Sequence, residues 1–384
     1  MDKYKLVKYT KGTVIFRNGE EAKDYFYIIS RGKILSCNTF CDNFTIKYNE
    51  GGIIGIIQSV TGEPYYSTSE TAEDCELWQI KTENINRLNN KHLINKISNY
   101  LSFILERWLS KYYSIITKNK IDLYNKDDIL TMASIYKEGG FIDASYKLCK
   151  AYLNSFKENI NIDKVNNFIK SLTPAKKPEY IKKNLLKITK GYCLYSELEI
   201  SNYIYYIKSG KLGVYNIING KYITRAVYTS GYIINGYSPV LEYKPLLTTV
   251  IALEDSVIEI INQDELIKNL YSNAELRIKF IKMISIKIIS TVLKIKAVKK
   301  ENIRHKFILI IYSILKIETL FSMPEYLKLL YKIDDIKNML NLDIENEIIY
   351  SELKKIKYIE LDSLNSIIVI DIVNYFKEYE DYTK

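Results

Sequence analysis

Short runs of β-branched and aromatic residues, each closed by a glycine, mark two separate stretches of the chain. Residues 25–32 read YFYIISRG and residues 203–210 read YIYYIKSG. Runs of this composition are typical of strands. Gly32 and Gly210 can adopt the positive φ angle that a turn before the next strand requires. Because such strands recur at short intervals, the pattern predicts an antiparallel sandwich or jelly roll in each stretch.

A helical period follows each strand-rich stretch. Residues 94–116 and 278–298 carry apolar side chains three and four positions apart, which predicts one long helix in each place. The apolar stripe of such a helix is buried either in the core of its own chain or in a subunit interface. Both interpretations stay open, and the second would make the protein a homo-oligomer or an internal pseudo-dimer. The predicted fold class is mixed α and β, with two antiparallel β-rolls and flanking helices.

A helical hairpin is predicted between the two stretches, within residues 127–172. Small residues at Ala133, Gly140 and Ala144 would let two helices approach closely. The pattern resembles a single tetratricopeptide-type unit, which is too little for a free-standing solenoid. We therefore interpret this segment as a helical spacer, and the proline-containing residues 174–178 mark its end.

The two strand-rich stretches are copies of one another. Glycine, proline and aromatic residues rarely stay in step by chance over such a length. The aligned pairs are Gly12 with Gly191, Tyr25 with Tyr203, Tyr27 with Tyr205, Gly32 with Gly210, Gly55 with Gly236, Pro64 with Pro245, Thr68 with Thr249 and Asp74 with Asp255.

The shared residues resemble the cyclic-nucleotide-binding domain. The resemblance covers about residues 4–118 and 180–300, and it implies a β-roll that senses a cyclic nucleotide. In the first copy the pattern reads Gly12-x-x-Ile15-Phe16-x-x-Gly19-Glu20, then Tyr27-Ile28-Ile29-x-x-Gly32-x-Ile34, and then Gly51, Gly55, Pro64 and Thr68.

Domains of this family hold the ligand in a phosphate-binding cassette, a Gly-Glu element followed by Pro-Arg-x-Ala-Thr. The resemblance implies that the glutamate accepts from the ribose hydroxyl and that the arginine meets the cyclic phosphate. The first copy keeps Gly55, but Ile56 stands at the glutamate position and Tyr65 at the arginine position. The second copy has Tyr237 after its glycine and Leu246 at the arginine position. Losing the charge-assisted hydrogen bond forfeits about 1.5–3 kcal/mol, so we predict weak or absent binding of cAMP or cGMP at both sites.

The candidate ligand-binding residues are those of two altered cassettes. The resemblance implies a cyclic nucleotide as cofactor, and no other cofactor is expected. Either the pockets bind a less charged and more aromatic ligand, or the domains are structural. Tyr65 and Tyr66 would stack on a base in the first case and fill the vacant pocket in the second, which we favour. The candidates are Gly55, Ile56, Tyr65, Ser67 and Thr68 in the first copy and Gly236, Tyr237, Thr248 and Thr249 in the second.

Residues 301–384 resemble the winged-helix DNA-binding domain that follows the sensor in CRP-type transcription regulators. Residues 333–342 would form the first helix of the motif, with Asn341 at the turn because asparagine tolerates a left-handed conformation. Residues 345–356 would form the recognition helix, and residues 358–361 and 366–370 the wing. The candidate DNA-contacting residues are Asn346, Tyr350, Ser351, Lys354 and Lys355.

The charge of this segment argues against DNA binding, although its predicted architecture favours it. Residues 332–360 contain five lysines and seven acidic residues, a local balance of −2, although the whole chain carries +10. Affinity for DNA rests largely on neutralising phosphates, so an acidic recognition helix would repel it. A DNA-reading domain and a module that binds protein partners both remain open.

Catalytic and metal-binding patterns are missing from the sequence. It contains two histidines, His92 and His305, and no nucleophile elbow, Walker loop or GxGxxG. The five cysteines form no CxxC pair, which favours reduced thiols over a metal site. The sequence shows no signal peptide and no apolar run long enough to span a membrane, so we expect a cytoplasmic protein that is not an enzyme.

Four domains follow from these patterns. They are a first sensor-like roll with its helix (1–118), the spacer (119–178), a second roll with its helix (179–300) and a winged-helix-like end (301–384). The first functional hypothesis is a CRP-like transcription regulator with degenerate cassettes. The second is a signalling scaffold whose ligand-free domains bind protein partners.

Overall fold

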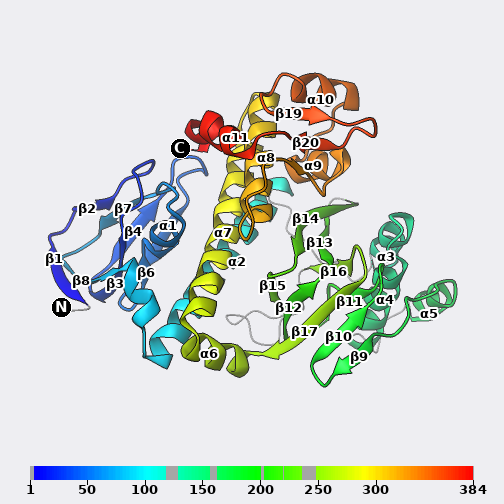
Figure 1. The fold of residues 1–384 in the computed structure, drawn as a ribbon, viewed down its shortest axis with the longest axis horizontal. Coiled ribbons are helices and arrows are strands. Elements are labelled where there is room, and N and C mark those ends of the chain that lie inside the picture. The colour runs from blue at the N-terminus through cyan, green and yellow to red at the C-terminus, as the bar shows by residue number, and fades with distance from the viewer. Residues whose placement is uncertain are drawn as a thin grey trace. The chain divides into compact units, whose positions relative to one another are not determined.

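The computed structural model describes residues 4–117, 129–155, 162–199, 203–218, 220–235 and 248–383 (Figure 1). The chain divides into two compact units. The first unit consists of Met1–Tyr112, Leu266–Leu320 and Asp371–Lys384, and the second of Tyr113–Glu265 and Phe321–Ile370. Each unit contains one antiparallel β-roll, so the predicted mixed fold with two rolls is confirmed.

The first roll consists of two four-stranded sheets, in the orders β1-β8-β3-β6 and β2-β7-β4-β5. Gly32 follows β3 with φ 96°, and a Cβ there would lie 2.7 Å from the carbonyl oxygen of Asp74, so the turn requires glycine. The strands are β1 (Lys5–Tyr9), β2 (Val14–Phe16), β3 (Tyr25–Arg31), β4 (Ile34–Cys37), β5 (Thr45–Tyr48), β6 (Ile53–Ile54), β7 (Thr68–Thr71) and β8 (Cys75–Lys81).

Helices from three parts of the chain complete the first unit. Helix α7 packs against α1, α8 and η1. Its apolar stripe is buried within the chain, because Ile281, Ile288 and Ile295 are at most 3% exposed. The predicted homo-oligomer stays a prediction. The helices are α1 (Ile56–Thr61), η1 (Thr82–Arg87), α2 (Lys91–Ile116), α6 (Gln263–Ser272), α7 (Ala274–Lys299), α8 (Ile303–Glu318), α11 (Ile372–Tyr379) and η3 (Glu380–Thr383), with the last turn of α2 and the first residues of α6 in the second unit.

The second roll repeats the strand order of the first and adds one strand at an edge. Its sheets have the orders β15-β12-β17-β10-β9 and β11-β16-β13-β14, in which β9 is the addition. The strands are β9 (Glu179–Lys182), β10 (Leu185–Ile188), β11 (Cys193–Tyr195), β12 (Tyr203–Ser209), β13 (Lys211–Ile218), β14 (Lys221–Thr229), β15 (Ile233–Asn235), β16 (Thr249–Ala252) and β17 (Ser256–Asn262).

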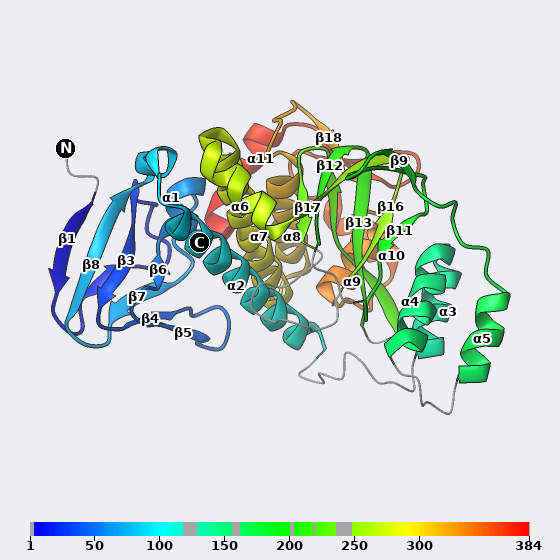
Figure 2. The same cartoon turned by 90° about the horizontal axis from the view of Figure 1, so that it is seen from below.

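The spacer helices are α3 (Ile129–Glu138), α4 (Ile142–Ser155) and α5 (Ile162–Lys170). Helices α3 and α4 form the predicted hairpin, and α4 lies beside β11 and β16 of the second roll (Figure 2). Ala133 and Ala144 are fully buried, as expected of small residues between close helices. Asp143 fixes the hairpin to the roll, because its Oδ2 accepts from the Cys193 N–H at 2.7 Å. The resemblance to a tetratricopeptide unit stays a prediction.

The end of the second unit contains two short helices and a small sheet. These elements are β18 (Leu327–Lys328), α9 (Ile333–Leu340), α10 (Asn346–Leu353), β19 (Ile359–Leu361) and β20 (Ile367–Val369), with the sheet order β18-β20-β19. Asn341 ends α9 in the left-handed conformation at φ 50°, as predicted. Over the residues that the structure describes, no helix is both long and apolar enough to cross a membrane.

Candidate functional site

The cassette of the first roll begins at Gly55, which lies between β6 and α1. Gly55 has φ 81°, and a Cβ there would lie 2.8 Å from the ring of Phe16. Only glycine therefore lets the start of α1 approach β2 so closely. Ile56, at the position of the family's glutamate, is fully buried. A side chain that offers a carboxylate to a ribose is replaced there by one that belongs to the core.

Tyr65, at the position of the family's arginine, is also part of the core. Its ring stacks on Phe16, with centroids 4.1 Å apart and planes 15° apart. The Tyr65 hydroxyl accepts from the backbone N–H of Lys23 at 3.3 Å. Burial raises the pKa of Tyr65 well above its ordinary value, so the hydroxyl stays neutral. Tyr65 therefore supplies packing where the family supplies a positive charge.

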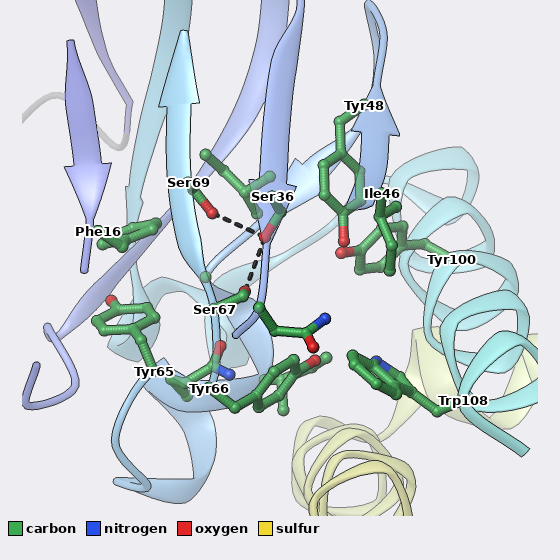
Figure 3. Close-up of a pocket in the computed structure, with 15 residues that line it drawn as sticks. Phe16, Ser36, Ile46, Tyr48, Tyr65, Tyr66, Ser67, Ser69, Tyr100 and Trp108 are labelled. Atoms are coloured by element: carbon green, nitrogen blue, oxygen red, sulfur yellow. Dashed lines mark hydrogen bonds between the residues drawn. The ribbon is translucent and has the colours of Figure 1, made fainter. Parts of the chain in front are cut away.

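A row of hydroxyl groups follows the cassette along β7 and β4. The Ser36 and Ser67 hydroxyls are 2.7 Å apart, and Ser69 donates to Ser36 at 3.1 Å (Figure 3). Thr68 points elsewhere, because its Oγ1 accepts from the N–H of Asn18 at 3.1 Å. Of the predicted cassette residues, Gly55, Tyr65 and Ser67 line one cavity. Ile56 and Thr68 do not line it.

Aromatic side chains occupy most of the space in front of this cassette. Tyr66 meets Trp108 of α2 edge to face, with centroids 5.5 Å apart. Tyr48 and Tyr100 lie beside them with centroids 6.3 Å apart (Figure 3). Burial raises the pKa of Tyr48 to about 12. The space that remains is about 30 Å³, which is room for one water molecule. We call this space the first pocket.

The first pocket is uncharged. Its walls come from β2, β4 and the residue Asn38 after it, β5, β6, α1, the cassette, β7 and α2. No charged side chain is among the residues that form them in the described part of the chain. A cyclic phosphate placed there would meet neither a cation nor a vacant volume. Small-molecule sites usually measure roughly 300–1,000 Å³, which is at least about ten times the volume of the first pocket.

The cassette of the second roll lies only partly within the residues that the structure describes. Gly236, Tyr237 and Leu246 fall outside them. Thr248 and Thr249 are buried, and Thr249 Oγ1 accepts from the N–H of Glu197 at 3.1 Å. Thr249 thus takes the same part as Thr68 in the first roll, which supports the alignment of the two copies.

The second roll carries a partly buried cation that the sequence patterns did not reveal. Val214 of β13 pairs with Ala226 of β14, but the next residue, Tyr215, pairs with Thr224. Arg225 therefore has no partner in the register and is the extra residue of a β-bulge. Burial disfavours the charged form of Arg225, yet Tyr113, Tyr228 and Tyr195 hold its pKa above the ordinary value. A one-residue insertion in a strand leaves no motif, so only a register comparison of the two copies could have found it.

A buried carboxyl group joins the second roll to the spacer. Glu197 accepts from the Tyr136 hydroxyl at 2.9 Å and from the Ile217 N–H at 3.2 Å. Burial raises the pKa of Glu197 to about 7 even though these hydrogen bonds favour the charged form. The side chain therefore changes charge close to neutral pH, inside the contact between α3 and the roll.

Helix α9 is attached to β14 by polar contacts. Asp335 Oδ1 bonds to the Thr224 hydroxyl, while its Oδ2 accepts from the Lys332 N–H at 2.8 Å and caps the helix. Asn338 donates to the Tyr222 carbonyl oxygen at 3.2 Å. Thr224 is the residue before Arg225 in β14. Thr224 therefore contacts α9, while its neighbour Arg225 interacts with the tyrosines named above.

The five candidate DNA-contacting residues lie on or next to α10, which is shorter than the predicted helix of residues 345–356. Ser351, Lys354 and Lys355 are exposed. Lys355 pairs with Glu352 at 2.5 Å, and Asn346 accepts from Lys337 Nζ at 3.0 Å. Tyr350 is half-buried. The structure therefore leaves Ser351 and Lys354 as the candidates that face solvent without a recorded side-chain partner.

Sequence comparison identifies the two rolls. The family model described as "Cyclic nucleotide-binding domain" matches residues 6–92 and 185–273. Both rolls therefore match the model of one domain family, and the predicted tandem repeat is confirmed. Among curated proteins, none matches this sequence.

Solved structures with similar parts have low identity to this chain. A cAMP-bound PfPKA-R (141–441) is 16% identical, with 76% of this chain and 79% of that chain covered and a TM-score of 0.26. A CooA mutant from Carboxydothermus hydrogenoformans is 17% identical, with 51% and 87% covered and a TM-score of 0.40. A cAMP-binding acyltransferase from Mycobacterium smegmatis is 21% identical, with 28% and 34% covered and a TM-score of 0.25, so this chain spans about a third of it.

Proposed function

We propose that this chain is a non-enzymatic regulatory protein of CRP-like plan, in which the C-terminal elements form a winged helix that binds DNA. The order of those elements carries the proposal. After α7 come helix α8, strand β18, helices α9 and α10, and the hairpin β19–β20. Helix, strand, two helices and two strands is the order of a winged helix, and α10 takes the place of the recognition helix. The domain order 1–118, 119–178, 179–300 and 301–384 belongs to this proposal.

The attachment of α9 to β14 supports a regulatory role. A regulator must transmit the state of a sensor to its output, and this needs a physical contact between the two. Thr224 and Asp335 provide it within the second unit. The Tyr331 hydroxyl, which accepts from the Val227 N–H at 2.8 Å, adds a second attachment point.

A gel shift at low salt on random duplex DNA tests the DNA-binding role. The variant Lys354→Glu/Lys355→Glu should weaken binding at least about tenfold, because it replaces two cations at the end of α10 with anions. The matched control is Lys176→Glu/Lys177→Glu, which makes the same charge change at two exposed lysines before β9. No shift of the parent protein, even at low salt, would count against DNA as the partner.

Binding of a protein partner is the second candidate function. Glu345 and Glu347 at the start of α10 are exposed, and Ile348 is 44% exposed beside them. An acidic rim around an exposed apolar side chain suits a protein surface better than a phosphate backbone. In a pull-down with the full chain as bait, partner capture that depends on Ile348 and survives Lys354→Glu/Lys355→Glu would favour this candidate.

We also propose that cAMP and cGMP bind weakly or not at all. The uncharged and nearly filled first pocket supports this for the first roll. Isothermal titration calorimetry of the full chain should give no dissociation constant as tight as about 1 μM for either nucleotide. If tighter binding is found, the variant Arg225→Met shows which roll is responsible. Removing that cation should abolish binding at the second roll and leave binding at the first roll unchanged.

A further inference from the structure

Strand β9 is the addition that distinguishes the second roll from the first. In the first roll the corresponding sheet ends at β1, whereas in the second roll β9 extends the sheet beyond β10 (Figure 1). All four residues of β9 are exposed, so the strand adds little to the core of the roll. The first roll folds into the same strand order without such a strand, which leaves β9 free to serve another purpose.

The outer edge of β9 has no partner strand. It is the last strand in the order β15-β12-β17-β10-β9, and among the described residues its backbone pairs with β10 alone. Alternate residues of an edge strand direct their N–H and C=O groups away from the sheet, where they can pair with another extended chain. Strand β9 therefore offers backbone donors and acceptors at the margin of the second roll.

Two apolar side chains of β9 lie in solvent. Tyr180 is 66% exposed, and the adjacent Ile181 is 49% exposed. Leu186 pairs with Tyr180 and Leu185 pairs with Lys182, so Ile181 has no partner in the register and is the extra residue of a bulge. Short length, lysines and bulges are the usual protection of an edge strand against unwanted pairing. That protection does not explain an exposed tyrosine and isoleucine, which a partner strand would bury.

Lysines surround these two side chains. Residues 176–190 contain six exposed lysines and one acidic residue, Glu179, and none of the six forms an ion pair in the part of the chain that the structure describes. A second copy of this chain would bring the same lysines together, and like charges on paired strands are destabilising. An acidic chain would neutralise them instead. The lysines are Lys176, Lys177, Lys182, Lys183, Lys187 and Lys190.

We propose that β9 binds an extended, acidic segment of a partner protein, which joins the sheet as one more strand. Backbone hydrogen bonds along the outer edge of β9 supply part of the affinity, and Tyr180 and Ile181 pack against apolar side chains of the segment. The lysines pair with its carboxylates and exclude basic chains. The first roll has no equivalent of β9 and therefore lacks this site. The proposal goes beyond DNA binding and does not depend on it.

Fluorescence polarisation with the full chain at low ionic strength tests the proposal. The probe is a short labelled peptide of alternating glutamate and valine, which should bind saturably with a dissociation constant of about 100 μM or tighter. A peptide of the same sequence with N-methylated amides throughout keeps the charge but cannot donate hydrogen bonds to the edge. A peptide with lysine in place of glutamate reverses the charge. Both control peptides should bind at least about tenfold more weakly.

Substitutions in β9 and the turn after it locate the binding. Lys182→Glu/Lys183→Glu should weaken binding of the glutamate–valine peptide at least about tenfold, because it replaces attraction with repulsion. Tyr180→Ser/Ile181→Ser should have an effect of about the same size through lost apolar contact. The matched control Lys268→Glu/Lys282→Glu makes the same charge change at exposed lysines of the first unit and should leave binding unchanged. Far-UV circular dichroism confirms that each variant is folded.

Three results would overturn the proposal. The first is no saturable binding of the glutamate–valine peptide to the folded parent protein. The second is equal binding of the N-methylated peptide, which would reduce the site to a patch of charge without strand pairing. The third is binding to phosphatidylserine vesicles, measured by sedimentation, that depends on Tyr180 and Ile181 while the peptide does not bind, which would make the same residues a membrane-binding surface.

Discussion

The first and second rolls share one strand order, but their interiors differ in kind. The first closes on uncharged aromatic rings, with Tyr65 and Tyr66 in the places nearest the lost arginine. The second contains the ionisable groups Arg225 and Glu197 and is attached to α4 and α9 on its outside. The difference shows that one strand order can enclose an uncharged aromatic core in one copy and hold ionisable groups and contacts to neighbouring helices in the other.

Removing the largest ring of the first pocket should have the largest effect on this comparison. Trp108→Ala deletes a fully buried side chain that also contacts Phe40 and Phe44, and we expect it to destabilise the first unit by about 3–5 kcal/mol. Hydrogen exchange read by mass spectrometry should show lost protection in peptides from residues 25–81 and little change in residues 203–229. Equal loss in both units would mean that the rolls are not separately stabilised.

The charge of Glu197 should make the second unit sensitive to pH. A carboxyl with a raised folded pKa binds more protons when folded, so stability falls as the pH rises from about 4.5 to about 7. The loss from this group is up to about 3 kcal/mol. Urea denaturation of the parent and of Glu197→Gln across this range should diverge as the pH rises, with the variant keeping more of its stability. Parallel curves would contradict the assignment.

The attachment of α9 should have the smallest of the three effects. Asp335→Asn keeps an N-terminal cap but removes the carboxylate that meets Thr224, and we expect a loss of about 1 kcal/mol. Thr224→Val is its partner in a double-mutant cycle, and Asp362→Asn is a control that removes a carboxylate bonded to Lys328. A coupling energy near zero between positions 224 and 335 would remove the contact from any account of signal transmission.

Local patterns in the sequence were enough for the scaffold. The turn glycines are required at Gly32 and Gly210, where φ is 96° and 98°, and Asn341 ends α9 as expected. Strands β19 and β20 lie within the predicted ranges 358–361 and 366–370, and helices α3 and α4 lie within residues 127–172. These features depend on residues close in sequence, which is why hydrophobic spacing and turn chemistry predict them.

The contents of the pockets could not be predicted in the same way. The first pocket is filled by Tyr100 and Trp108 of α2, which lie far from the cassette in sequence. The bulge at Arg225 depends on register, and the positive φ of Leu198 (72°) occurs where no turn signal stands. Filling of the first pocket by Tyr66 agrees with the interpretation favoured from the sequence. The weak affinity for cyclic nucleotides stays a prediction.

The first unit takes its segments from the beginning, middle and end of the chain. During synthesis the first roll is therefore complete long before α7 and α8, which pack against its region, have left the ribosome. The second unit is largely made in that interval. A nascent first roll would expose the surface of α1 that α7 later covers, so chaperone demand and proteolytic sensitivity should be greatest on partly synthesised chains. Terminal truncation before Asp371 would prolong that state in the finished protein.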